Sequence, residues 1–209
     1  MRSRRYGERD VLVDVASVAA AQALARRLDG AAGVVDVVPA ARTLLVRCDG
    51  VPSARRWADA LATEDEPDVD TDAVPVARPR EVEIAVVYDG ADLDAVARGA
   101  GLSVADVVAR HTARPYRAAF AGFAPGFVYL EGLDPVLATP RLAVPRTGVP
   151  AGSVAVAAEM TAVYPRSSPG GWNLLGRTDA VMFDLDRERP ALIEPGDVVR
   201  FVDVGRGSA

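Results

Sequence analysis

The chain has 209 residues, half of them hydrophobic, which is enough to bury the core of one large domain or of two small ones. It carries 29 acidic residues against 24 basic ones, a formal net charge of -5, which argues against a nucleic-acid-binding protein that must neutralise phosphates. Every basic residue is an arginine. A Walker A lysine, a Schiff base and a lysine that carries biotin or pyridoxal phosphate are therefore excluded.

Cysteine and histidine occur once each. Cys48 is the sole cysteine, so the chain forms no intrachain disulfide and no multi-thiolate metal site, and we expect a small buried residue in a strand. His111 is the sole histidine, which excludes a histidine-rich metal site. The sequence therefore predicts no metal centre.

The N-terminus begins with Arg2, Arg4 and Arg5, as the first part of a signal peptide does, but Asp10 and Asp14 soon interrupt the apolar run that follows. No segment reaches the roughly 18 apolar residues that a membrane span requires. We therefore expect a cytoplasmic protein that does not contact a membrane.

The first part of the chain predicts a strand, a helix, two strands and a second helix. The strands are residues 11–15, 34–38 and 43–48; Ser17 caps the first helix, which ends at Gly30, and Ser53 opens the second. This order is most of a ferredoxin-like α+β unit, which needs one more strand, and Val74 to Ala77 is the candidate.

Six acidic residues lie between Glu64 and Asp72, and Pro67, Pro75 and Pro79 interrupt or follow them. A solvated linker explains this composition better than a specific docking surface. We therefore expect a ferredoxin-like α+β domain at residues 1–77 and a second domain at residues 78–209.

The second part begins with a strand at Glu81 to Asp89, followed by helical residues 92–98 and by a helix that Ser103 and Asp106 cap and that ends at His111. Short apolar runs separated by glycine and proline come next, at residues 116–123, 152–158, 180–185 and 197–204. Many short strands with frequent turns are typical of a mainly-β barrel or sandwich.

The densest motifs lie between Phe120 and Thr178. They read GFAPGFVYL, LATPR, VPAGSV and YPRSSPGGWNLLGRT. Glycine and proline at this density predict rigid turns, and rigid turns that carry aromatic and arginine side chains are where binding sites are commonly built.

These motifs resemble the family of 5-oxoprolinase B subunits, also described as KipI-like or as allophanate hydrolase subunit 1. The resemblance is strong from His111 to Val204 and loose in the first eighty residues. It implies a cyclophilin-like β-barrel for the second domain, and the family has a histidine at the place of His111.

The candidate site combines an anion-binding turn with aromatic side chains. In RSSPGG, the N–H groups of Ser168, Gly170 and Gly171 can face an anion that arginines hold with bidentate bonds. The candidate arginines are Arg141, Arg146, Arg166 and Arg177; the alternative is that they are solvated or pair with Asp179, Asp184 and Glu159. We expect Tyr129, Tyr164 and Trp172 to line a groove, and Phe127 can lie in the groove or in the core. His111 and Arg177 are the catalytic candidates, although packing or capping explains a histidine at a helix end better than acid–base work does.

The resemblance implies one component of an ATP-dependent 5-oxoprolinase, which opens the lactam ring of the small-molecule substrate 5-oxoproline to give glutamate; the chain is expected to be inactive alone. The implied partners are a C subunit, of the allophanate hydrolase subunit 2 type, and an A subunit. The chain has no nucleotide motif and no cofactor of its own, so a partner is expected to use the ATP.

Two alternatives remain open: a KipI-type inhibitor that docks on a sensor histidine kinase, and a carboxyltransferase-like module of urea carboxylase or allophanate hydrolase. The sequence also departs from the family pattern at Val128, Leu142 and Met160. Met160 stands where the family has a glutamine, and a thioether cannot orient a substrate as an amide does.

Overall fold

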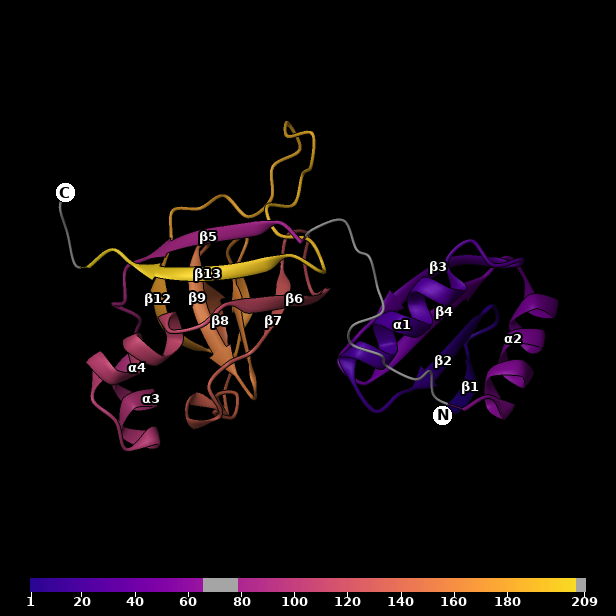
Figure 1. The fold of residues 1–209 in the computed structure, drawn as a ribbon, viewed down its shortest axis with the longest axis horizontal. Helices are drawn as coiled ribbons and strands as arrows, with labels where there is room; N and C mark the ends of the chain where they lie inside the picture. Colours follow the sequence, from indigo (N-terminus) through magenta and orange to yellow (C-terminus); the bar gives the residue numbers. More distant parts are fainter. Residues whose placement is uncertain (66–78, 206–209) are drawn as a thin grey trace. The chain divides into compact units, whose positions relative to one another are not determined.

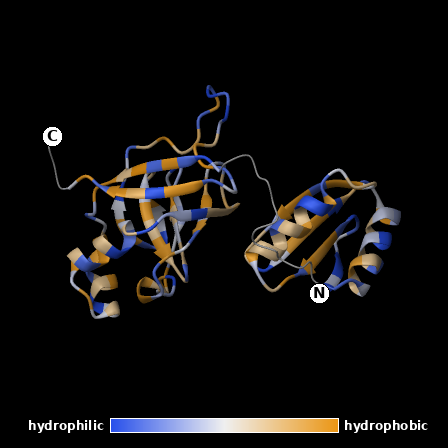
Figure 2. Cartoon of the chain, viewed as in Figure 1, coloured by the Kyte–Doolittle hydropathy of each residue, from blue (hydrophilic) through white to orange (hydrophobic). Residues whose placement is uncertain are grey.

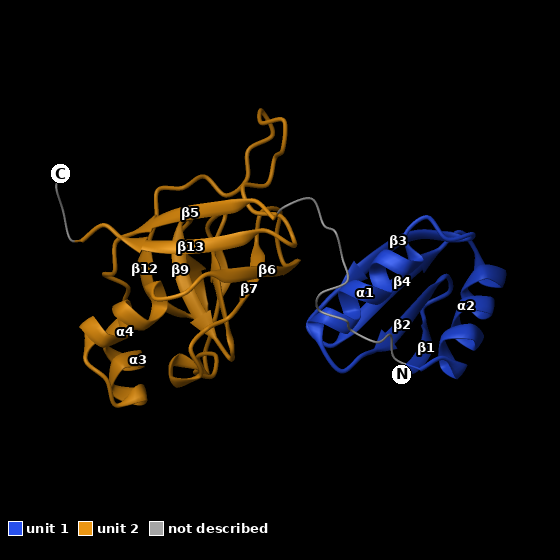
Figure 3. Cartoon of the chain, in the orientation of Figure 1, with its two compact units in different colours: residues 1–76 blue, residues 77–209 orange. Residues whose placement is uncertain are grey.

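The computed structural model describes residues 1–65 and 79–205. The chain divides into two compact units, Met1–Val76 and Ala77–Ala209, which Figure 3 colours separately. No helix within the described ranges is long and apolar enough to cross a membrane.

The first unit is a four-stranded antiparallel sheet with two helices (Figure 1). In chain order its elements are β1 (Arg2–Tyr6), β2 (Asp10–Asp14), α1 (Val18–Leu28), β3 (Val34–Pro39), β4 (Thr43–Cys48) and α2 (Val51–Thr63). The sheet order is β1-β2-β4-β3. Both helices cover the same face, because Leu24 of α1 and Leu61 of α2 share one buried cluster with Val13 and Val46 of the sheet.

Two local predictions for this unit are confirmed. The Ser17 hydroxyl accepts a hydrogen bond from the Ala20 N–H and caps α1. Cys48 is 6% exposed at the end of β4.

Two others need correction or lie outside the described residues. α2 begins at Val51 after Gly50 and not at Ser53, because Pro52 has a fixed φ that suits a first helical turn. The expected strand from Val74 to Ala77 is outside the described part. The edge beside β2 is instead occupied by β1, a strand that the pattern had not predicted.

The second unit is built on a seven-stranded sheet in the order β12-β9-β10-β7-β6-β13-β5. Its strands are β5 (Glu81–Val86), β6 (Tyr116–Ala121), β7 (Val128–Glu131), β9 (Ser153–Ala157), β10 (Met160–Val163), β12 (Asn173–Arg177) and β13 (Val198–Asp203). β5 pairs with β13 in parallel, and the other neighbours are antiparallel. The burial pattern alternates along β5 and β13, and Figure 2 shows the matching hydrophobic and hydrophilic bands.

The two edge strands of this sheet meet and nearly close it into a barrel. Val87, just after β5, and Arg177 on β12 exchange two backbone hydrogen bonds of 2.9 Å. Glycine is needed at this seam, because a Cβ on Gly176 would lie 2.4 Å from the Val87 carbonyl oxygen, and one on Gly90 would lie 2.3 Å from the Leu174 carbonyl oxygen.

Two helices, α3 (Leu93–Ala100) and α4 (Val104–Thr112), pack together beside the barrel (Figure 1). The predicted capping of α4 is confirmed: Ser103 and Asp106 form a reciprocal capping box. A 3-10 turn, η1 (Pro135–Leu137), follows β7, and a separate two-stranded ribbon pairs β8 (Arg146–Val149) with β11 (Ser168–Gly170).

The prediction of a strand at residues 180–185 is wrong. This stretch forms a loop with a single bridge between Phe183 and Ala191. Met182 is buried in the barrel core, whereas Val181 and Leu185 are 54% and 79% exposed. The apolar sequence of residues 180–185 is typical of a strand, but here most of its apolar side chains lie in an exposed loop and Met182 is the one that is buried in the core.

Candidate functional site

The strands on one side of the barrel are buried on both faces. Along β9, Val154 and Val156 point into the barrel core, whereas Ala155 and Ala157 belong to a second cluster on the outer wall. The small alanines leave room there for large rings. The outer cluster, which we call the aromatic cluster, includes Phe127, Tyr129, Tyr164 and Trp172.

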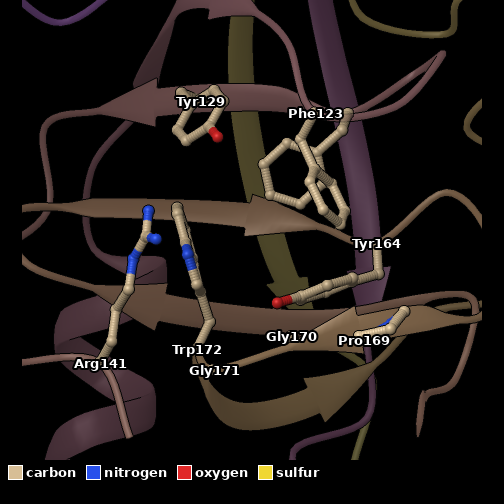
Figure 4. Close-up of a pocket in the computed structure, with 9 residues that line it drawn as sticks. Phe123, Tyr129, Arg141, Tyr164, Pro169, Gly170, Gly171 and Trp172 are labelled. Carbon is tan, nitrogen blue, oxygen red and sulfur yellow. The ribbon is translucent and has the colours of Figure 1, made fainter. Parts of the chain in front are cut away.

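A pocket opens in the aromatic cluster (Figure 4). Its volume is about 80 Å³. The lining combines five rings, one guanidinium and a turn of small residues: Phe123, Phe127, Tyr129, Arg141, Tyr164, Pro169, Gly170, Gly171 and Trp172.

The rings of the pocket are arranged edge to face. Phe127 lies at the centre, with ring centroids 5.0 Å from Tyr129, 5.4 Å from Tyr164 and 5.7 Å from Trp172. Such pairs are favourable beyond their buried area, so they hold the walls in fixed positions. Phe123 differs from the others: it is 60% exposed and has a φ of 68°.

Arg141 supplies the charge of the pocket. Its guanidinium lies over the Trp172 ring, 5.9 Å from the ring centroid, and Figure 4 shows the two side chains side by side. Arg141 is exposed and forms no ion pair with any carboxylate of the described residues. Its donors therefore remain available to an anionic ligand.

Two hydrogen bonds fix the backbone that carries Arg141. The Leu142 N–H donates to the Gly171 carbonyl oxygen at 2.7 Å, and the Asn173 side-chain amide donates to the Pro140 carbonyl oxygen at 2.9 Å. Asn173 is itself 7% exposed. The arginine and the tryptophan therefore belong to one clamped unit, although their positions are about thirty residues apart in sequence.

Tyr164 forms the wall beside the glycine turn. Burial raises the pKa of Tyr164, and the Trp172 backbone N–H and the guanidinium groups of Arg141 and Arg146 act in the opposite direction. The phenol is therefore neutral at physiological pH and acts as a hydrogen-bonding group rather than as a base.

Four residues of the predicted anion site do not line the pocket: Arg146, Arg166, Ser168 and Arg177. Arg166 is exposed in the turn after Tyr164. Arg146 is paired with Asp92 at 2.7 Å, and Asp92 also accepts a 2.7 Å hydrogen bond from the Leu174 N–H. Arg177 pairs with Asp89 at the barrel seam. Ser168 is in β11, where its hydroxyl oxygen is buried without a hydrogen-bond partner among the described residues.

His111 lies in the barrel core and is fully buried. Its Nδ1 is 2.7 Å from the Tyr88 hydroxyl, and its Nε2 is 3.0 Å from Thr161 Oγ1. Thr161 donates its own hydrogen to the Ala155 carbonyl oxygen, so it accepts from His111 and the ring is the Nε2–H tautomer. Burial lowers the pKa of His111 to about 3.

The structure thus brings together six of the residues predicted to bind substrate and leaves His111 outside the pocket. Pattern reasoning missed Phe123 and Pro169 as pocket residues, although both lie in the motifs that it singled out. It also missed Asn173 and Asp92, whose supporting roles depend on contacts between distant segments.

The fold and the pocket define a class: a barrel protein with a small, ring-lined pocket on its outer wall, to which one arginine side chain contributes. Ligand pockets for larger molecules typically measure about 300–1,000 Å³, so a pocket of 80 Å³ suits a small ligand or one that a second polypeptide helps to enclose.

Comparison with known proteins gives the particular family. A family model described as carboxyltransferase domain, subdomain C and D, matches residues 1–193. The chain is 40% identical over 198 residues to the 5-oxoprolinase B subunit of Escherichia coli O157:H7, an alignment that covers 88% of this chain and 84% of that protein. It is 34% identical over 183 residues to the Bacillus subtilis (strain 168) protein of the same name, covering 82% and 76%. The chain belongs to the family of 5-oxoprolinase B subunits.

Solved structures are similar over nearly the whole chain. A crystal structure of TTHA0988 has a TM-score of 0.75 and 39% identity over 96% of this chain, which corresponds to 41% of that longer chain. A conserved uncharacterized protein, PH0987 from Pyrococcus horikoshii, has a TM-score of 0.58 and 32% identity, covering 97% of both chains. The K. lactis urea amidolyase has a TM-score of 0.78 at 19% identity, covering 97% of this chain and 15% of that one, which shows a shared fold.

Proposed function

We propose that this chain is the B subunit of a 5-oxoprolinase and that its aromatic pocket binds the substrate, 5-oxoproline. The observation that carries the proposal is the Arg141 guanidinium, which is unpaired within the described residues and held over Trp172 at the mouth of a small ring-lined pocket. Membership of the family of 5-oxoprolinase B subunits supplies the reaction.

The chemistry of the substrate suits the lining. 5-Oxoproline is a five-membered lactam with one carboxylate, so it presents a compact ring and a single negative charge. The carboxylate would take a bidentate interaction from Arg141, and the ring would pack against Trp172 and Tyr129. The Tyr164 hydroxyl and the backbone at Gly170 and Gly171 would be placed to recognise the lactam amide.

Opening a lactam requires activation of a resonance-stabilised amide and stabilisation of the developing oxyanion. The pocket offers hydrogen-bond donors and a cation for this purpose but no base near neutral pKa, since Tyr164 has a raised pKa and His111 lies in the core. We therefore infer that partner subunits, of the A and C types, contribute catalytic groups and use the ATP. The small volume of the pocket supports a site that a partner completes.

We also infer that the second unit is a cyclophilin-like barrel and that the first is a variant of the ferredoxin-like fold. In that variant β1 takes the edge position that the last strand would otherwise occupy beside β2. The support is the strand order together with the two helices on one face.

A second candidate, a KipI-type docking role on a kinase, is favoured by one observation. Phe123 is 60% exposed at the rim of the pocket, and large exposed rings commonly mark protein interfaces. Under this alternative the pocket would accept a side chain of the partner protein instead of a small anion.

Fluorescence of Trp172 tests the substrate proposal. The chain has two tryptophans, and Trp57 lies in the other unit, so a Trp57→Phe variant makes Trp172 the sole reporter of the pocket. Titration with 5-oxoproline, in the presence of non-tryptophan variants of the partner subunits, should give a saturable change. The proposal predicts that 2-pyrrolidinone, the same lactam without the carboxylate, binds far more weakly. Equal responses to both compounds, or none to either, would contradict it.

A further inference from the structure

The face of the first unit's sheet that lies opposite α1 and α2 carries an ordered pattern of side chains. Residues on the helix side of the sheet alternate with residues that belong to no hydrophobic core cluster. Examples of the second kind are Leu12 and Leu45, which are half-buried, and Val38, which is 41% exposed. We call this surface the open face.

Strand register places these apolar residues in a single row. Leu12 on β2 is paired with Leu45 on β4, and Leu45 is paired with Val38 on β3. Directly paired residues of neighbouring strands lie about 4.5–5.5 Å apart, so the three side chains form an apolar strip over β2, β4 and β3. On β1 the row continues with Arg4, which is paired with Leu12 in register and forms an ion pair with Asp14.

Polar rows lie on both sides of the strip. On one side, Asp10 is paired with Arg47 in register, and their side chains approach to 4.0 Å. On the other side, Asp14 is paired with Thr43. The sheet thus has a charged pair and an apolar pair at the centre of one surface, on the two middle strands.

On the two middle strands, β2 and β4, this pattern is complementary to itself. Consider two copies placed face to face, with a two-fold axis between them that runs parallel to the strands and midway between β2 and β4. The axis places β2 of one copy opposite β4 of the other, so each Asp10 faces an Arg47 and each Leu12 faces a Leu45. In such an isologous interface, a residue and its register partner contact each other reciprocally.

We propose that the open face is a homodimer interface, whose occupant is the open face of a second copy of this chain. Sheets that pack face to face bury their central apolar rows about 10 Å apart, and charge complementarity fixes the register. This proposal concerns the first unit and goes beyond the proposed function, which concerns the pocket of the second.

The expected dimer is weak. Four strands at about 4.8 Å spacing and five residues at about 3.3 Å give a footprint of roughly 300 Å². Stable complexes bury about 800 Å² of accessible surface on each partner. The dimer should therefore dissociate on dilution, so a single measurement at one concentration would not detect it reliably.

Sedimentation velocity of the full chain over a wide concentration range tests the proposal. The wild type should show a reversible monomer–dimer equilibrium. Asp10→Arg places two arginines against each other across the interface, and Arg47→Asp places two aspartates there, so each variant alone should dimerise at least about tenfold more weakly. An equimolar mixture of the two variants should recover dimerisation, because the arginine introduced at position 10 then faces the aspartate introduced at position 47 of the other chain.

A variant with both substitutions in one chain provides the second measurement. It restores both opposite-charge contacts in the homodimer and removes the like-charge pair that each single variant carries within its own sheet. It should dimerise as the wild type does, even where a single variant is less stable. Thermal unfolding identifies any single variant that fails to fold.

Three experimental results would each overturn the proposal. A wild type that stays monomeric at every concentration, a dimer indifferent to either single substitution, or a failure of both the mixture and the double variant to recover dimerisation overturns the proposal. None of these outcomes depends on substrate binding, so failure here is distinguishable from failure of the proposed function.

Discussion

Gly170 lies directly against the ring of Tyr164. A Cβ atom on residue 170 would be 2.3 Å from the Tyr164 hydroxyl oxygen and 2.9 Å from two ring carbons. No side chain fits there unless the tyrosine moves, and the tyrosine is enclosed by Phe127 and Phe123. The shape of the pocket therefore depends on a residue that contributes no side chain to it.

The first prediction concerns this contact. Gly170→Ala should displace Tyr164, weaken binding of 5-oxoproline and lower the free energy of unfolding by about 1–3 kcal/mol, the usual cost of overpacking. The matched control is Gly148→Ala on the other strand of the same ribbon, where an added Cβ meets nothing within 4 Å. Chemical unfolding and ligand titration of both variants provide the comparison. Equal behaviour of the two variants would show that Tyr164 is free to move.

The barrel seam gives the second prediction. Gly176→Ala would bring a methyl group to 2.4 Å from the Val87 carbonyl oxygen, which is backbone and cannot rotate away. We expect a loss of at least about 2 kcal/mol in the free energy of unfolding. Gly99→Ala in α3 meets nothing within 4 Å and should instead be neutral or stabilising by about 0.5–1 kcal/mol. An unaltered melting temperature for Gly176→Ala would show that the seam is open in solution.

The third prediction concerns pH. Burial lowers the pKa of His111 from 6.5 to about 3, so the unfolded chain binds a proton at this residue in a pH range where the folded chain does not. The folded state is therefore favoured above pH 6.5 and loses stability as the pH falls from about 6.5 toward 3, by about 1.4 kcal/mol per pH unit.

A His111→Gln variant isolates this effect. Glutamine keeps a donor and an acceptor for Tyr88 and Thr161 but does not titrate. Between about pH 7 and pH 5, above the range where most carboxylates titrate, unfolding free energies of the wild type should fall more steeply than those of the variant. Parallel curves would mean that His111 is hydrated and charged in the folded protein.

Much of the architecture was predictable because it is local. Ser17 and Ser103 cap helices by contacts three residues away, and residues 43–48 alternate in burial as a strand on a half-covered sheet should. β1 was not predictable in this way, because RSRRY is an edge strand with one neighbour, and its exposed arginines carry no apolar alternation.

The kinds of residue that line the pocket were predictable from the sequence, but the individual residues that line it were not. Tyr129, Tyr164 and Trp172 lie in it because alanines on β9 and β10 leave space on the outer wall. The sequence does not distinguish Arg141 from Arg177 as a ligand-binding residue. In the folded barrel Arg177 is paired with Asp89, which lies 88 positions earlier in the chain. Pairing between distant segments cannot be inferred from residue type and spacing alone.

The central claim is that Arg141 holds the substrate carboxylate, and turnover of 5-oxoproline by the reconstituted complex tests it most directly. Arg141→Ala should reduce kcat/KM by about 10- to 150-fold, the equivalent of a charge-assisted hydrogen bond of about 1.5–3 kcal/mol, and Arg141→Lys should recover only part of it because an ammonium lacks the planar fork. The control Arg98→Ala, an exposed arginine on α3, and the seam variant Arg177→Ala should both retain most of the activity. An Arg141→Ala complex that assembles normally and turns over 5-oxoproline at the wild-type rate would contradict the account.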